Sequence, residues 1–199
     1  MANNLKSFVT VNANDDAINE LNRRLEMCDT NDILSFAKAF YNDVDVASDG
    51  KSVMNEWSLD NLGSKWNYLY DIIDNNQFSM ESAWYPPQDF FSHLFKLMYD
   101  IDPEVSIEVL YEDEGYDPIG AFVYTKDGKG NLVYAHDYED EMEDPTLEMD
   151  WDDEGYEDAQ MEFMDSIYER QQEMLAYCKE MIDDDEGENI FELKEETKS

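Results

Sequence analysis

The chain has few basic residues. Thirteen lysines and arginines stand against fifty aspartates and glutamates in 199 residues, giving a formal net charge of -37. The basic residues are scattered, and Arg23-Arg24 is the nearest approach to a cluster. Direct binding to nucleic acid or to an anionic membrane is disfavoured, because both ligands are negatively charged. A small domain needs a charge of only roughly 2 to 8 for solubility, so the acidity indicates a basic partner.

Cysteines and long apolar runs are also scarce. Cys28 and Cys178 are the only cysteines and form no CxxC motif. The amino terminus has no secretory apolar segment, so we expect a reduced, cytoplasmic location. No apolar run approaches the ~18 to 20 residues of a membrane span. Hydrophobic content of 42% and aromatic content of 14% still predict a packed core rather than a wholly disordered chain.

The sequence lacks a recognisable catalytic constellation. His93 and His136 are the only histidines, and neither lies in a motif for acid–base or nucleophilic chemistry. Residues 150–155 begin like a calcium-binding EF-hand loop, but Met161 stands where the loop needs its final glutamate. We therefore expect no enzyme activity, no cofactor and no dedicated metal site.

Apolar periodicity predicts a mixed α+β fold. Helical spacing predicts a helical region over 15–41, with a joint near Asp29, and another helix that begins with Pro86-Pro87 in its first turn. The stretch 44–60 loses its periodicity and is interpreted as a loop. Alternating runs predict strands at residues 8–11, 68–73, 77–84, 105–111, 119–125 and 132–135. The first four strands and two helical regions follow the split βαβ, or ferredoxin-like, order, and the last two strands add a β-hairpin.

Several short motifs resemble a known family. Asn61-x-Gly63-x-Lys65-Trp66 resembles an element of the phage and plasmid proteins described as Api92-like or YubB-like. The stretches 3–11, 82–87 and 111–115 are similar to further motifs of that family. The resemblance covers about residues 1–137. It implies a ferredoxin-like domain and an origin in a mobile element, and it supplies no catalytic residue.

The stretch from Asp137 to Asp158 holds thirteen carboxylates and no lysine or arginine. Low apolar content and the Asp-Pro pair at 144–145 predict a mobile connection. Trp151 lies inside it, where an aromatic side chain either anchors a partner or docks the segment onto the domain. The expected organisation is a ferredoxin-like domain over 1–137, an acidic connecting segment over 138–158, an amphipathic acidic helix over 159–182 and a disordered acidic tail over 183–199.

The predicted carboxy-terminal helix has two unlike faces. One broad side carries Met164, Ile167, Tyr168, Met174, Leu175, Cys178, Met181 and Ile182. A narrow opposite stripe carries Asp158, Glu162, Asp165, Glu169, Glu173 and Glu180, with no cation in it. Like charges at i,i+4 destabilise a helix by a few tenths of a kcal/mol per pair. The stripe is therefore either a solvated face maintained at some cost or a binding surface.

The leading hypothesis is a phage-encoded, non-enzymatic inhibitor. It would bind a basic, nucleic-acid-handling host protein, such as a DNA-binding defence or restriction component, through an acidic surface that mimics DNA. One alternative is a binding protein that blocks a host assembly or ATPase surface without mimicry, and another is a small metabolic or metal-dependent phage protein. The candidate partner-binding residues are Glu139, Asp140, Glu141, Glu143, Asp144, Asp150, Trp151, Asp152, Asp153, Glu154, Asp158, Glu162, Asp165, Glu169 and Glu173.

Overall fold

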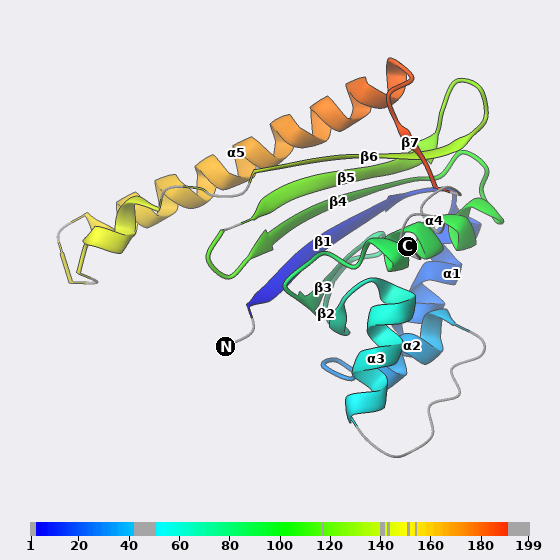
Figure 1. Cartoon of the computed structure of the whole chain (residues 1–199), viewed down its shortest axis with the longest axis horizontal. Coiled ribbons are helices and arrows are strands. Elements are labelled where there is room, and N and C mark those ends of the chain that lie inside the picture. The colour runs from blue at the N-terminus through cyan, green and yellow to red at the C-terminus, as the bar shows by residue number, and fades with distance from the viewer. Residues whose placement is uncertain are drawn as a thin grey trace.

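The computed structural model describes residues 3–41, 51–116, 118–139, 142, 144–150, 152–153 and 155–190, with the backbone alone at 51–55 and 147–148. These residues form a mixed α+β fold with one seven-stranded antiparallel sheet (Figure 1). Its elements are β1 (Asn4–Asn12), α1 (Asp15–Leu25), α2 (Ile33–Phe40), α3 (Lys51–Leu62), β2 (Lys65–Asp74), β3 (Gln77–Ala83), α4 (Gln88–Tyr99), β4 (Ser106–Asp113), β5 (Ile119–Lys126), β6 (Leu132–Glu139), the 3-10 helix η1 (Pro145–Glu148), α5 (Tyr156–Asp183) and β7 (Glu188–Asn189).

The strands follow the spatial order β2-β3-β1-β4-β5-β6-β7, and each neighbouring pair is antiparallel. Val9 of β1 lies opposite Phe78 of β3 and Val109 of β4. Because side chains alternate between the two faces of a strand, this register gathers apolar residues on one face, which we call the inner face.

The main core lies between the inner face and the helices α1, α2 and α4. Asn14 caps α1 by accepting a hydrogen bond from the backbone N–H of Ala17 at 3.1 Å. Helix α4 follows Pro86-Pro87 directly, with Pro87 at its N-cap rather than in its first turn. Aromatic side chains fill much of this core. Its largest fully buried members include Phe36, Phe40, Phe78, Phe90, Phe91, Phe95, Tyr111, Phe122 and Tyr124.

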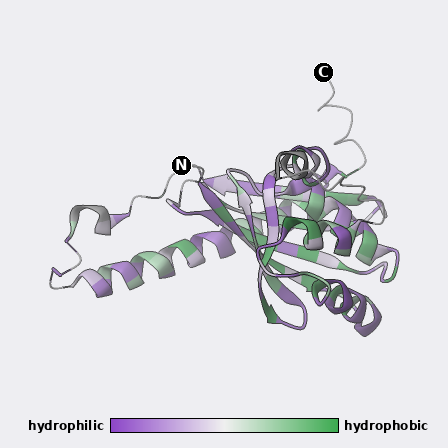
Figure 2. Cartoon of the chain, turned by 90° about the horizontal axis from the view of Figure 1, so that it is seen from below, coloured by the Kyte–Doolittle hydropathy of each residue, from purple (hydrophilic) through white to green (hydrophobic). Residues whose placement is uncertain are grey.

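A second core lies on the opposite, outer face, where α5 packs over β5 and β6. Phe163, Ile167 and Met174 of α5 are buried there against Ala121 and Val123 of β5. Figures 1 and 2 show the amino-terminal turns of α5 extending past the end of the sheet. The helix is thus anchored along part of its length and projects along the rest.

The interpretation of residues 44–60 as a loop is wrong from Lys51 onward, where α3 begins; residues 42–50 lie outside the described part of the chain. The helix shows little apolar periodicity because one of its buried positions is Ser58, while Trp57 is only half-buried. Its packing against β2 and α4 supplies the stabilisation that the local pattern does not indicate.

The expectation of a disordered tail over 183–199 is wrong for its first part. β7 pairs with β6, and Ile190 is buried in the main core. Tyr134 Oη donates a hydrogen bond to the Glu188 carboxylate at 2.6 Å, and Lys129 pairs with Asp185 at 2.7 Å. Backbone pairing with β6, one buried isoleucine and two side-chain contacts hold this segment, and none of them produces a periodic pattern in the sequence. Residues 191–199 lie outside the described part of the chain.

Two expected boundaries also differ from the observed elements. The boundary after residue 137 falls inside β6, which continues to Glu139. The helix expected over 159–182 begins at Tyr156 and ends at Asp183. Because α5 shares a core with β5 and β6, it packs on the same sheet as the preceding elements and is not a separate appendage.

Candidate partner-binding surface

The described carboxylates of the predicted stripe point away from the outer core. Glu180 is exposed, and so are the five members that are candidate partner-binding residues: Asp158, Glu162, Asp165, Glu169 and Glu173. Their helix is held by a buried face on its other side, which consists of Phe163, Ile167, Gln171, Met174, Leu175, Cys178 and Ile182. The packing of α5 therefore presents these carboxylates to solvent on a fixed helix, and we call these five residues the acid stripe.

The predicted apolar side of α5 is wrong in two places. Met164 and Tyr168 are 39% and 60% exposed, whereas Phe163 and Gln171 are buried. The difference arises because α5 packs over β5 and β6, so the side of the helix that faces β1 and β4 is left uncovered. Gln171 satisfies its buried amide by donating to the carbonyl of Tyr111 at 3.0 Å.

Arg170 pairs with two of the candidate residues. Its Nε donates to Glu139 at 2.7 Å and its Nη1 donates to Glu173 at 3.0 Å. These hydrogen bonds raise the pKa of the guanidinium above its ordinary value. The expected stripe without a cation is thus wrong at Glu173, because Arg170 lies one turn away along the helix and reaches both carboxylates. Exposed pairs of this kind are worth ~0–1 kcal/mol.

Two acidic residues of the connecting segment have local structural roles. Asp144 caps η1 by accepting hydrogen bonds from the backbone N–H and the hydroxyl of Thr146, at 2.8 and 2.7 Å. The Asp153 carboxylate accepts from the backbone N–H of Asp150 at 2.9 Å. Asp152 is exposed. The remaining candidates of this segment lie outside the described residues: Asp140, Glu141, Glu143, Trp151 and Glu154.

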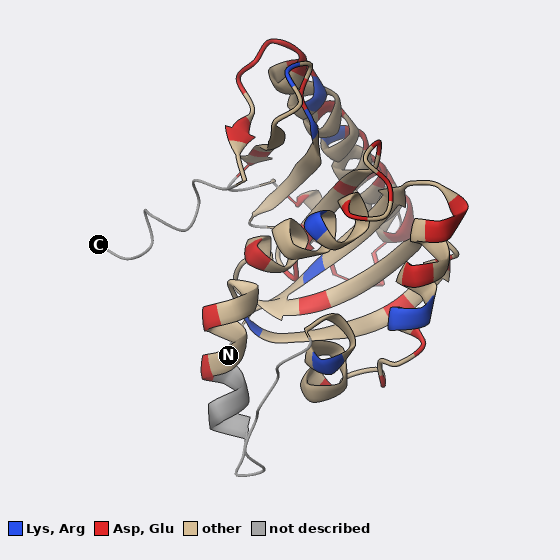
Figure 3. Ribbon diagram, turned by 90° about the vertical axis from the view of Figure 1, so that its right-hand side faces the viewer, with Lys and Arg blue, Asp and Glu red and all other residues tan. Residues whose placement is uncertain are grey.

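Acidic residues far outnumber basic residues on the described elements. Figure 3 shows acidic residues on most elements, with the lysines and arginines at scattered positions. Helix α5 alone has eight carboxylates and two cations in its sequence. A basic partner approaching α5 therefore meets a surface of nearly uniform sign, and such a field accelerates association.

Both histidines are built into aromatic packing. The His93 ring stacks on Tyr41 with centroids 4.1 Å apart, and its Nε2 lies 3.0 Å from the carbonyl oxygen of Phe40. The His136 ring stacks on Phe122 at 4.0 Å, and its Nε2 is hydrogen-bonded to Tyr111 Oη at 2.8 Å. Burial lowers the pKa of His136 to about 4, although nearby carboxylates oppose the shift.

The thiols are similarly enclosed. Burial raises the pKa of both Cys28 and Cys178 to about 12, so neither is a ready thiolate nucleophile. Within the described ranges, no group of three or more histidine, cysteine, aspartate or glutamate side chains is arranged to hold a metal ion. No described helix has the length and apolar character required to span a membrane.

Sequence reasoning missed an exposed aromatic corner at one end of the sheet. The rings of Trp66 and Trp84 lie 5.9 Å apart, and Trp84 N–H donates to the Asn3 carbonyl at 3.2 Å. Both tryptophans have positive φ, of 57° and 63°. Bulky residues rarely adopt this conformation, which costs ~1–3 kcal/mol and recurs at functional sites. Tyr85 beside them is 69% exposed.

Comparison of the chain with protein-family models, with curated proteins and with solved structures finds no match.

Proposed function

We propose that this protein is a phage-encoded, non-enzymatic inhibitor that acts in the host cytoplasm. Its partner is a basic, nucleic-acid-handling host protein, a DNA-binding defence or restriction component. The observation that carries this proposal is the acid stripe: five carboxylates exposed on a helix whose opposite face is buried in the outer core.

The spacing of the stripe suits a surface that normally binds nucleic acid. Carboxylates one helical turn apart are separated by about 5.4 Å along the axis. Phosphates along one strand of B-DNA recur every ~3.4 Å of helix axis, which is of the same order. A groove lined with lysine and arginine would therefore find several negative charges within reach on α5, and occupation of that groove excludes DNA.

A fold proposal accompanies the functional one. The order β2-β3-β1-β4, with α1, α2 and α3 between β1 and β2 and α4 between β3 and β4, supports a ferredoxin-like core with an elaborated first connection. On this interpretation β5 and β6 are an added hairpin, and α5 covers it. The resemblance of residues 1–137 to Api92-like proteins supports the mobile-element origin.

The test is capture from bacterial lysate with the full chain as bait. A stripe variant carries Glu162→Gln, Asp165→Asn and Glu169→Gln. The control variant carries Glu26→Gln, Glu56→Gln and Asp71→Asn, which removes the same charge from exposed positions elsewhere. We expect a basic DNA-binding protein to be retained by the wild type and the control, and to be lost from the stripe variant, in high salt, or on addition of duplex DNA.

Retention that is equal for the stripe variant and the control, or capture of proteins without a basic surface, would refute the proposal.

One observation favours the alternative of a surface blocker without mimicry. Trp84 and Tyr85 are exposed at the aromatic corner, and exposed aromatic residues are common anchors at protein interfaces. A blocker that uses this corner would release its partner on Tyr85→Ala and would ignore competing duplex DNA. The two functions are thus separated by the same capture experiment.

A further inference from the structure

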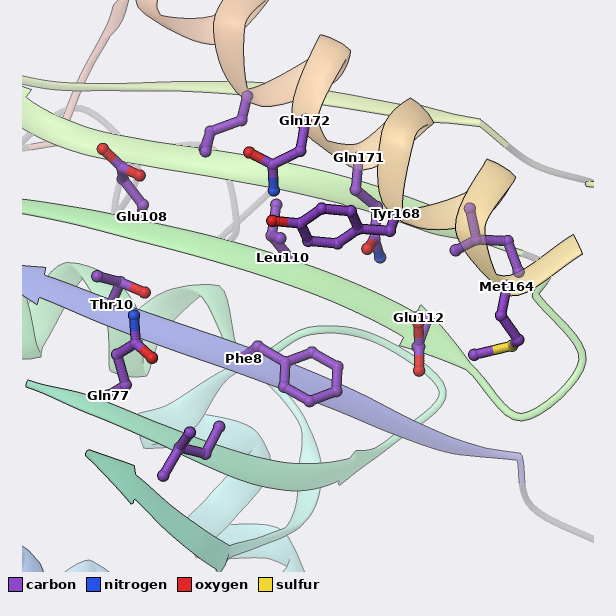
Figure 4. A pocket seen from close by; sticks show the side chains of 13 residues that line it. Phe8, Thr10, Gln77, Glu108, Leu110, Glu112, Met164, Tyr168, Gln171 and Gln172 are labelled. Carbon is purple, nitrogen blue, oxygen red and sulfur yellow. The ribbon is translucent and has the colours of Figure 1, made fainter. Parts of the chain in front are cut away.

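A groove runs between α5 and the part of the outer face that α5 leaves uncovered. Its floor is formed by β1 and β4, with Gln77 of β3 and Ile73 of β2 at its edge, and one wall is formed by α5 (Figure 4). The groove has a volume of about 520 Å³. This volume falls within the ~300–1,000 Å³ typical of ligand sites. The groove is distinct from the acid stripe, since none of the stripe residues lines it.

The floor is apolar in its middle. Phe8 of β1 lies directly opposite Leu110 of β4, and both side chains face the groove. Tyr168 and Met164 of α5 form the wall above them (Figure 4). Tyr116 Oη donates to the Met164 sulfur at 3.0 Å and so supports the wall at one end. An apolar side chain entering from a partner would contact two aromatic rings and two aliphatic or thioether chains.

A carboxylate stands beside this apolar floor. Glu112 lies two residues beyond Leu110 on the same face of β4, and it is half-buried. Among the described residues, no side chain donates a hydrogen bond to its carboxylate; burial raises its pKa, and the nearby charge of Lys6 opposes that shift. Its cross-strand neighbour Lys6 instead holds its ammonium over the rings of Tyr70 and Phe8, at 4.3 and 5.1 Å.

The charge of the chain decides which kind of partner can enter. A second copy would bring another net charge of -37 to the same face, and that repulsion opposes self-association. A cationic partner is attracted by the same field. A Lys or Arg side chain would give Glu112 the hydrogen-bond donors that it lacks.

We propose that the groove binds an extended segment of a partner protein in which an apolar side chain is followed two positions later by lysine or arginine. In an extended chain, residues i and i+2 lie on one side and ~6.6 Å apart, as Leu110 and Glu112 do on β4. The apolar side chain packs on Phe8, Leu110 and Tyr168, and the cation pairs with Glu112. This site goes beyond the acid stripe and does not require mimicry of DNA.

The test is a titration of the full chain, followed by the NMR shifts of its backbone amides. The probe is a short peptide with a central Leu-Ser-Arg, and the reference peptides carry Leu-Ser-Glu or Ser-Ser-Arg. We expect the first peptide to shift amides around Phe8, Leu110, Glu112 and Tyr168, and both reference peptides to bind at least about tenfold more weakly, because each lacks one of the two contacts.

Matched variants separate the groove from general electrostatics. Glu112→Gln should weaken the Leu-Ser-Arg peptide about tenfold, while Glu180→Gln, an exposed carboxylate of α5, should not. Tyr168→Ala should weaken it, while Tyr177→Ala should not, although both tyrosines are exposed on α5, at 60% and 50%. The stripe variant should keep its groove affinity, so failure of the groove and failure of the stripe are distinguishable.

Shifts confined to the acid stripe, equal binding of the Leu-Ser-Glu peptide, or an unchanged affinity in both Glu112→Gln and Tyr168→Ala would overturn the proposal.

Discussion

Replacement of Gly120 by alanine tests the inner face where the Tyr111 ring crosses a glycine. The Cβ of an alanine at this position would lie 2.5 Å from Tyr111 Cζ and 2.7 Å from its Cε1. The Tyr111 ring cannot yield freely, because it is 2% exposed, packs on Phe122 at 5.6 Å and is hydrogen-bonded to His136. Either the ring or the strand must shift, and the hydrogen bond is strained with it.

Overpacking of a tight core typically costs ~1–3 kcal/mol. In a chain of this length each kcal/mol lowers the melting temperature by ~2–4 °C, so we expect Gly120→Ala to melt ~2–12 °C below the wild type. Gly128→Ala is the matched control, because nothing lies within 4 Å of the added methyl group. The assay is thermal unfolding followed by circular dichroism. Equal melting temperatures for the two variants would show that the Tyr111 contact is not as tight as described.

Three further predictions concern stability. The pKa of His136 in the folded protein, about 4, lies below its ordinary value of 6.5. The neutral side chain therefore contributes fully to the free energy of unfolding above pH 6.5, and this contribution falls by up to about 3 kcal/mol as the pH drops towards 4. Urea unfolding at several pH values should show a weaker dependence of stability on pH for His136→Phe than for the wild type. Ile167→Ala should lower the free energy of unfolding by ~2–5 kcal/mol and Met161→Ala by less than about 0.5 kcal/mol, because the Ile167 side chain is 1% exposed and that of Met161 is 60% exposed. Similar losses for the two variants in urea unfolding would mean that α5 buries a different face. Ile190→Ala should cost ~2–5 kcal/mol, whereas a disordered tail would give no change.

Much of the fold was predictable from local patterns. β1 shows why: its buried positions Leu5, Val9 and Val11 alternate with partly exposed residues, so the sequence period matches the pleat of the strand. Helix α4 combines Pro86-Pro87 at its start with an apolar stripe, and it lies where expected. Elements of this kind can be predicted because only one of their faces is buried, which gives their apolar residues a regular spacing in the sequence.

Other elements carry no such signal. Helix α3 buries Ser58, and β7 has only two residues, with one buried apolar side chain, Ile190, next to it, so neither shows a periodic pattern. Their positions follow from contacts with segments far away in the sequence. Burial of a few side chains by distant partners stabilises an element without patterning its own residues.

Some features of the candidate surfaces were likewise predictable from the sequence, and others were not. The sequence by itself determined the sign of the charge, the amphipathic character of α5 and the exposure of Glu162, Asp165 and Glu169, because helical geometry relates spacing to face. Only the tertiary structure decided that Arg170 joins Glu139 to Glu173, that Tyr168 faces a groove and that Glu112 lies beside Phe8 and Leu110. These contacts depend on which strands α5 covers. The packing of two elements that are distant in the sequence does not change the local residue pattern of either element, so it cannot be predicted from that pattern.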